Sequence, residues 1–410
     1  MTPRRFLDRK SAPHILTLAV ATAFGSLAMS IFLPSLPAIA RHFSADYAVM
    51  QLAVTLYLVA TAVLQLFIGP LSDRYGRRPV LLTFMCIALI TTIGLIYAPT
   101  VEVFLAGRLL QGTAIAGLVV GRATVRDIVE PARAASMIGY VTMAMAVAPM
   151  VGPIIGGYLD QWFGWQSVFW ALFAFGVAAT ALVWADLGET NLRPGGSVSA
   201  QLRALPELIG SRRFWGYSLT AAFAVGSFYA FVGGGPYLSS NHFDLPSSEF
   251  GKYFAIVTVG YVTGNFLSGR YAARIGINAM LLAGGCVLVV GMMLALCLDW
   301  LGFTGPMAAF GPIIFVGLGN GLALPSANSG IVSVRPHLAG SASGFGGFIQ
   351  IAGGALMSAL AVALLGPGNG PVTLHLLLLA SGAISIVTTI YVIAVTRSEA
   401  RRAASTAGNV

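Results

Sequence analysis

Four charged side chains crowd into six positions of a sequence that otherwise avoids charge: Asp73, Arg74, Arg77 and Arg78. They lie in the segment GPLSDRYGRRP, residues 69–79, whereas only 9% of the 410 residues are charged. Because guanidinium groups form charge-assisted hydrogen bonds with carboxylates, Asp73 can form specific ion pairs here. Gly69 and Gly76 flank the charges, and this spacing predicts a tight turn with close helix approach.

A second residue of chemical interest, Arg108, lies inside an apolar run. It follows Glu102 by six residues, so a helix carries it about 9 Å further along its axis. A charge at that depth in a membrane costs a few kcal/mol unless it meets water or a partner. We therefore expect Arg108 either to face a cavity or to bond backbone carbonyls and Gln111 as a structural arginine.

The elements that position these residues are predicted from composition. Hydrophobic residues make up 57% of the chain and the mean hydropathy is +0.83, which is too apolar for a soluble globule of this size. The net charge of +9 comes from short basic clusters between apolar runs, a pattern typical of membrane topology rather than nucleic-acid binding. We expect no nucleic-acid partner.

Twelve uncharged or nearly uncharged windows are long enough to cross a bilayer as helices. They are residues 13–36, 47–69, 79–98, 101–127, 134–158, 164–185, 214–237, 250–269, 277–298, 306–330, 338–364 and 372–395. The sequence thus predicts an all-α membrane protein with twelve transmembrane helices in two six-helix bundles. We expect the bundles at 1–186 and 214–410, joined by a cytoplasmic linker at 187–213.

The positions of Lys and Arg predict the orientation. With the N-terminus in the cytoplasm, only Arg41 and Lys252 of the 23 basic residues fall on the outer side, and Arg108 falls within a span. The others lie at or near the cytoplasmic side, as the positive-inside rule requires. We expect both termini in the cytoplasm and a bacterial inner membrane.

An internal repeat supports the division into halves. The segment GRYAARIGIN begins at Gly269, 200 residues after GPLSDRYGRR begins at Gly69, and the two share three identities. Each segment joins the second and third spans of its half, which is the expectation for a duplicated bundle. Asp73 is replaced by Ala273 in the second copy.

Segment 69–79 resembles the signature loop of the major facilitator superfamily. RLLQGTAIAG (108–117) resembles the fourth-span motif with its buried arginine, and APMVGPIIGG (148–157) resembles the fifth-span motif of exporters. Together with FLPSLPAIA in the first span, the resemblance is greatest to the drug-exporting Bcr/CflA type.

The resemblance implies two bundles around a central cavity, with alternating access by rocking of one bundle against the other. It also implies a gating latch that closes the cytoplasmic face in the outward-open state. We define the latch as Asp73, Arg77 and Asp127 together with Gly69, Arg74, Gly76 and Arg78.

The first span departs from the resembled type. Exporters of that type usually carry an acidic residue just before the LP stretch, where this chain has Ser30. The middle of every predicted span lacks Asp and Glu. Proton coupling therefore has no obvious carboxylate, and it stays open whether the latch, Arg108 or nothing couples transport to protons.

Other polar residues within spans are candidates to line the cavity or, alternatively, to bond between helices. With Arg108 and Gln111 they are Ser30, Tyr57, Gln65, Asn265, Asn328 and Gln350. Proline removes a helix hydrogen bond and glycine permits close packing, so the fifth span should bend. Its bend motif is Pro149, Gly152, Pro153, Gly156 and Gly157.

The predicted function is export of small amphipathic drugs by a secondary transporter. The alternative is a metabolite exporter, for sugars or amino-acid derivatives, or an uncoupled facilitator. We expect no enzyme, because no catalytic cluster is apparent, and no cofactor or metal. The expected partners are a small-molecule substrate, protons as a candidate coupling ion and the lipid bilayer, and the expected state is a monomer.

Overall fold

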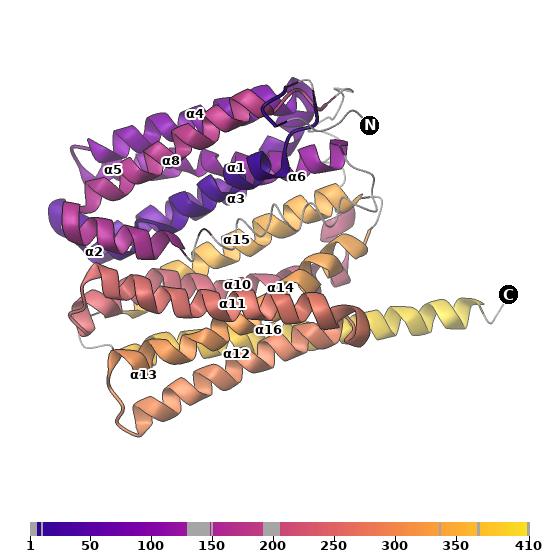
Figure 1. Ribbon diagram of the computed structural model, residues 1–410. Coiled ribbons are helices and arrows are strands. Elements are labelled where there is room, and N and C mark those ends of the chain that lie inside the picture. Colours follow the sequence, from indigo (N-terminus) through magenta and orange to yellow (C-terminus); the bar gives the residue numbers. More distant parts are fainter. Residues whose placement is uncertain are drawn as a thin grey trace. The chain divides into compact units, whose positions relative to one another are not determined.

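The computed structural model of the chain describes residues 6–9, 11–128, 148, 151–191, 206–335, 338–366 and 370–407. These residues are folded into helices joined by short connections, and no strand occurs among them (Figure 1). A helix satisfies its backbone N–H and C=O groups internally, and lipid offers these groups no hydrogen-bond partners. The predicted all-helical class is confirmed.

The described residues form two compact units, the first comprising Met1–Gln201 and Gly235–Thr258. Its helices are α1 (Ile15–Ser30), η1 (Leu33–Ser35), α2 (Leu36–His42), α3 (Tyr47–Tyr75), α4 (Arg77–Ile96), α5 (Val101–Gln111), η2 (Gly112–Ile115), α6 (Ala116–Ile128), the helical residues 151–163 and α8 (Trp165–Asp186). α1 packs against α6 and α8, and α4 packs against α5 and α8. Buried aromatic residues such as Phe24, Phe104 and Phe169 fill the space between these helices.

The second unit comprises Leu202–Gly234 and Val259–Val410. The helices of this half of the chain are α10 (Arg212–Tyr237), η3 (Leu238–His242), α11 (Ser247–Ile275), α12 (Ile277–Trp300), α13 (Pro306–Phe310), η4 (Gly311–Ile313), α14 (Ile314–Ser333), α15 (Ala339–Leu364) and α16 (Pro371–Ala407). The end of α10, η3 and the start of α11 belong to the first unit. Within the second unit, α12 packs against α14 and α16.

Ten helices of the described residues are long and apolar enough to cross a membrane. The predicted fifth span, 134–158, lies largely outside those residues. The predicted eighth span corresponds to α11, which is 29 residues long but is interrupted by polar residues and is not one of the ten. The division at 187–213 stays a prediction.

The last helix is longer than the hydropathy pattern predicts. α16 runs for 37 residues to Ala407, past the predicted span end at 395. Its yellow end continues beyond α12 and α14 in Figure 1. Alanine and arginine together make up seven of the twelve residues 396–407, and both favour helix without an apolar environment.

The predicted repeat is confirmed by the backbone. α3 and α11 each have 29 residues and end 200 positions apart, at Tyr75 and Ile275. Each is followed by one glycine with positive φ, +96° at Gly76 and +85° at Gly276, and then by the next long helix. The same hairpin is thus built twice.

Candidate functional site

The hairpin between α3 and α4 is held by a buried arginine. Arg77 is only 7% exposed, and its guanidinium forms ion pairs with Asp73 on α3 and with Asp127 on α6 (Nε to Oδ2, 2.9 Å). Its Nη1 also donates to Ser72 Oγ at 2.7 Å. The two carboxylates are 30% and 24% exposed, so these ion pairs are partly shielded from water. One arginine therefore joins the ends of α3, α4 and α6.

The turn itself depends on Gly76 and on a carboxylate from elsewhere in the chain. Because α4 begins at Arg77, the N–H groups of Arg77 and Arg78 have no partner inside the helix. Glu189 accepts both, with Oε1 at 2.9 Å from the nitrogen of Arg77 and Oε2 at 3.3 Å from that of Arg78. A negative group at a helix N-terminus is also favoured by the helix dipole. A Cβ atom on Gly76 would collide with this carboxylate.

The end of α8 and the residues that follow it contact the latch. Asn191 donates its Nδ2 to the carbonyl oxygen of Asp73 at 2.6 Å, and Arg78 donates to the carbonyl oxygen of Trp184 at 3.1 Å. Glu189 and Asn191 are not among the predicted site residues, because they lie in the predicted linker, 187–213. The available signal was an acidic residue, Glu189, close after the sixth span on the side rich in arginine.

Two predicted latch residues stand apart from this cluster. Arg74 is exposed and stacks over the ring of Tyr75, with 5.3 Å between the guanidinium carbon and the ring centroid. Gly69 lies inside α3, and a Cβ atom there would meet no atom of the described residues within 4 Å. α3 continues to Tyr75 and the chain turns at Gly76, so the turn is not at Gly69, and the close helix approach at Gly69 stays a prediction.

Arg108 is completely buried in the first unit. Its Nε donates to the carbonyl oxygen of Ala53 on α3 at 3.2 Å, and its Nη1 donates to that of Ala28 on α1 at 3.1 Å. Nη1 also donates to Oε1 of Gln111, one turn further along the chain. These are the contacts expected of a structural arginine that joins three helices, and contact between Arg108 and a substrate stays a prediction.

The surroundings of Arg108 are enclosed as well. The guanidinium lies over the rings of Phe32 and Tyr57, 4.0 and 4.6 Å from their centroids, where cation–π attraction stabilises it. The Tyr57 hydroxyl donates to a carbonyl oxygen of α1 at 2.7 Å. Gln111 donates its Nε2 to Thr92 Oγ1 on α4 at 2.7 Å. Hydrogen bonds thus connect α1, α3, α4 and α5 around one charge.

The other candidate lining residues are placed separately. Ser30 is fully buried and donates to a carbonyl oxygen of its own helix at 3.0 Å, as Asn265 does at 2.9 Å. Gln350 on α15 donates to Oδ1 of Asn328 on α14 at 2.8 Å. Gln65 is half-buried, and its Nε2 has no hydrogen-bond partner in the described part of the chain. Their contact with a substrate stays a prediction.

The glycines of the fifth-span motif lie in close contact with neighbouring helices. Pro149 lies outside the described residues, and Gly152, Pro153, Gly156 and Gly157 lie in the helical residues 151–163. A Cβ atom on Gly152 would lie 2.9 Å from Ser30 Oγ on α1. A Cβ atom on Gly157 would lie 2.6 Å from the carbonyl oxygen of Ser247 at the start of α11. The motif lets this helix touch the backbone of its neighbours, and the predicted bend stays a prediction.

The buried carboxylate of Asp186 is not among the predicted site residues. Asp186 is fully buried and accepts hydrogen bonds from the backbone nitrogens of Leu7 and His14, both at 2.8 Å, and from Thr17 Oγ1 at 2.6 Å. Three donors satisfy a buried carboxylate well. Asp186 therefore fastens the N-terminal segment and the start of α1 to the end of α8.

Comparison with known proteins identifies the class. Residues 18–358 match the family described as Major Facilitator Superfamily. The chain is 33% identical over 350 residues to a chloramphenicol resistance protein of Pseudomonas aeruginosa, covering 83% of this chain and 82% of that one. It is 30% identical over 358 residues to a bicyclomycin resistance protein homolog of Haemophilus influenzae, covering 85% and 89%.

Solved structures show the same fold. The human organic anion transporter MFSD10 aligns with a TM-score of 0.68 at 17% identity, covering 92% of this chain and 98% of that chain. A bacterial homolog of the human lysosomal transporter Spinster, in an inward-facing conformation, aligns with a TM-score of 0.66 at 17% identity, covering 92% and 94%.

The chain belongs to the Major Facilitator Superfamily, a family of multi-pass membrane transporters of small molecules, not of enzymes. Within that family it is of the Bcr/CflA type, to which its drug-resistance relatives belong.

Proposed function

We propose that this transporter exports small amphipathic drugs across the bacterial inner membrane by alternating access, with both termini in the cytoplasm. The observation that carries the proposal is the 33% identity over 350 residues to a protein named for chloramphenicol resistance. A relative in Escherichia coli that is 27% identical over 368 residues is named multidrug resistance protein D.

The latch supports a gating role for the cytoplasmic ends of the helices. Arg77 is paired with Asp73 and Asp127 at once, so α3, α4 and α6 are held together at one end. Partly shielded ion pairs can be broken and re-formed as their surroundings change, which suits a gate that must open and close. Glu189 and Asn191 add contacts that would move with the same ends.

We propose that export is coupled to proton entry. The second candidate is a facilitator without proton coupling. It is favoured by the small number of buried carboxylates, in the described part of the chain, that could carry a proton. Asp186 is the one carboxylate that is buried among the described residues, and its oxygens are taken up by three hydrogen bonds to Leu7, His14 and Thr17. The position that is acidic in the resembled exporters is Ser30, fully buried and bonded within its own helix.

A susceptibility panel tests the export function. The chain is expressed in an efflux-deficient bacterium and compared with the empty vector on chloramphenicol, other neutral drugs, anionic drugs and lipophilic cations. We expect the minimum inhibitory concentration of chloramphenicol to rise. Arg108→Lys should keep part of this resistance and Arg108→Ala should lose it, because Arg108 joins three helices. Membrane levels of each variant are measured in parallel. Unchanged susceptibility to the whole panel, with the chain present in the membrane, would overturn the proposal.

Coupling is tested separately in everted membrane vesicles. Respiration acidifies the vesicle interior, and accumulation of labelled chloramphenicol is followed before and after nigericin collapses the pH gradient. Proton antiport predicts that accumulation stops. Uptake that only equilibrates the drug across the membrane, and does so equally with and without the gradient, would indicate a facilitator without proton coupling. That result would leave the transport function in place.

A further inference from the structure

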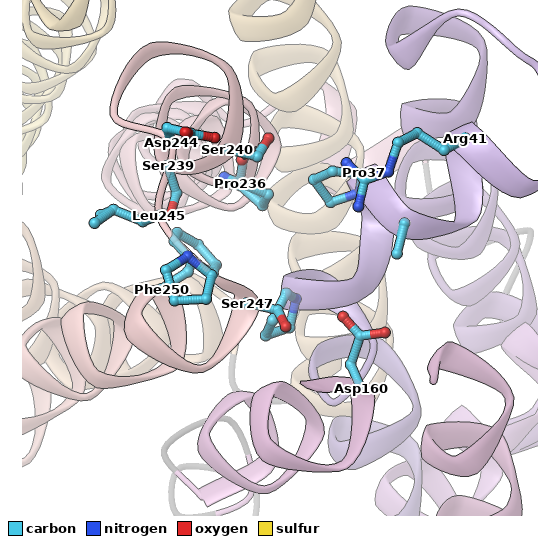
Figure 2. A pocket seen from close by; sticks show the side chains of 13 residues that line it. Pro37, Arg41, Asp160, Pro236, Ser239, Ser240, Asp244, Leu245, Ser247 and Phe250 are labelled. Atoms are coloured by element: carbon cyan, nitrogen blue, oxygen red, sulfur yellow. Dashed lines mark hydrogen bonds between the residues drawn. The ribbon is translucent and has the colours of Figure 1, made fainter. Parts of the chain in front are cut away.

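A cavity of about 300 Å³ lies within the first unit, near the end of α3 remote from Arg77 (Figure 2). Its walls come from η1 and α2, the helical residues 151–163, η3, the connection that follows η3 and the start of α11. On the predicted topology this end faces the outside of the cell. Its volume is at the lower end of the range for small-molecule sites.

The cavity presents charges of both signs. Figure 2 shows Arg41 and Asp160 on one side of the gap and Asp244 on the other. Neither Arg41 nor either carboxylate forms an ion pair within 4 Å with another described residue. Arg41 and Asp244 are exposed, whereas Asp160 is half-buried. Arg41 and Asp244 therefore have capacity for charge-assisted hydrogen bonds with a solute, and so has Asp160 beyond its interactions with Ser247, Arg41 and Ser35.

A buried hydroxyl beside the cavity lacks a partner. Ser239 lines the cavity and is 2% exposed, and its Oγ forms no hydrogen bond with the described part of the chain. An unsatisfied buried polar atom costs about 1–3 kcal/mol, so such atoms call for an explanation. Ser239 lies in the π-helical turn η3, a conformation that is frequent at functional sites. A hydrogen-bonding ligand would satisfy it.

The walls are rigid. Four prolines line the cavity and restrict its backbone: Pro34, Pro37, Pro236 and Pro246. Asp244 has a φ of +51°, in the left-handed region that Asp adopts more readily than most non-glycine residues. Phe250, which is 1% exposed, supplies an apolar surface. A preformed site loses little conformational entropy when it binds a ligand.

We propose that this cavity binds a small zwitterion, a molecule with an ammonium group and a carboxylate on a short, partly apolar frame. The ammonium group lies between Asp160 and Asp244, and the carboxylate pairs with Arg41. A purely anionic solute would be repelled by two carboxylates, and a purely cationic solute would be repelled by Arg41. The site goes beyond the proposed drug export and does not depend on it.

The affinity should depend on pH through Asp160. Burial raises the pKa of Asp160 above its ordinary value, although Ser247, Arg41 and Ser35 act to lower it. The other charged groups near this end are Asp244 and the exposed Glu249–Lys252 pair on α11. Since a raised pKa means protonation at a higher pH than usual, ammonium binding should weaken as the pH falls through that raised value.

The test is calorimetry on the purified full chain in nanodiscs with the dipeptide Ala-Phe as probe. Its N-acetylated form lacks the ammonium group and its C-terminal amide lacks the carboxylate. We expect Ala-Phe to bind and each capped form to bind about 10- to 100-fold more weakly, the usual effect of losing a hydrogen bond to a charged group. Absent Ala-Phe binding, or equal affinity for all three probes, would overturn the proposal.

Variants assign each charge. Asp160→Asn should weaken Ala-Phe binding about tenfold or more and reduce the penalty of N-acetylation, because Asp244 still faces the ammonium group. Arg41→Gln should remove the penalty of amidation. Lys252→Gln is the matched control, because Lys252 is exposed on α11 and does not line the cavity. Affinities that stay unchanged in both Asp160→Asn and Arg41→Gln would contradict the proposal. Arg41 is exposed, so its variant should fold even where Asp160→Asn does not.

Discussion

The turns at Gly76 and Gly276 have the same backbone conformation but different neighbouring side chains. Both glycines have positive φ and both follow a helix of 29 residues. At Gly76 the carboxylate of Glu189 occupies the space where a Cβ atom would lie, whereas at Gly276 none of the residues that the structure describes lies within 4 Å of that position. The hairpin therefore needs only the glycine, and the carboxylate is an addition in the first half.

The charged partners differ in the same way. Arg77 of the first turn corresponds to Ile277 in the second, and Asp73 corresponds to Ala273. The first turn joins three helix ends through Arg77, and the second turn has no equivalent arginine at that place. Duplication thus supplied two copies of one scaffold, and the ion pairs are built on one of them.

The largest effect on the free energy of unfolding is expected when the glycine of each turn is replaced by alanine. Gly76→Ala and Gly276→Ala both force alanine into a backbone region that costs about 1–3 kcal/mol. Gly76→Ala should lower the free energy of unfolding by about 1 kcal/mol more, because the new Cβ atom displaces Glu189 from the start of α4. Thermal unfolding of both variants in detergent measures the difference. Equal losses would show that Glu189 contributes nothing at this turn.

A smaller effect on stability is expected when Arg77 of the first turn is replaced by isoleucine, the residue at the corresponding position 277. Arg77→Ile leaves Asp73 and Asp127 without their partner, and should destabilise the chain by about 1–3 kcal/mol, between the values for exposed and buried pairs. Drug export should also fall, and by more than the loss of folded protein explains, because the ion pairs of Arg77 with Asp73 and Asp127 are lost. Arg74→Ile is the control, since Arg74 is exposed and touches neither carboxylate. If both variants exported equally well, the latch would have no role in gating.

The smallest effect is expected from the reverse exchange. Ala273→Asp restores the first turn's acid in the second, but position 277 is isoleucine and the site is exposed. The stability should change by less than about 0.5 kcal/mol. The double variant Ala273→Asp with Ile277→Arg should regain an ion pair across Gly276, measured as positive coupling in a double-mutant cycle. A zero coupling energy would mean that the backbone match does not extend to side-chain directions.

Much of the fold could be predicted, because lipid requires apolar helices of a certain length. The beginning of α3 at Tyr47 and that of α12 at Ile277 coincide with predicted windows. Helix ends beyond the bilayer are set by other forces, so the extension of the first span to His42 and of α16 to Ala407 had no hydropathy signal. There, local helix preference decides.

The site was predictable where partners are close in sequence or belong to a known motif. Asp73 and Arg77 are one helical turn apart, and Asp127 followed from the family resemblance. Glu189 bonds to a backbone nitrogen 112 residues away, and Asp186 bonds to one 179 residues away. Backbone donors leave no residue pattern, so pairing of this kind cannot be recognised from one sequence.

The continuous end of α16 has a practical use in imaging. Because the helix runs unbroken to Ala407, its final turns extend about 18 Å past the predicted span. A helical fusion partner joined in phase after Ala407 would keep a fixed direction relative to α16. Such a rigid marker would give electron cryomicroscopy a landmark for aligning particles that are otherwise hidden in a disc of lipid.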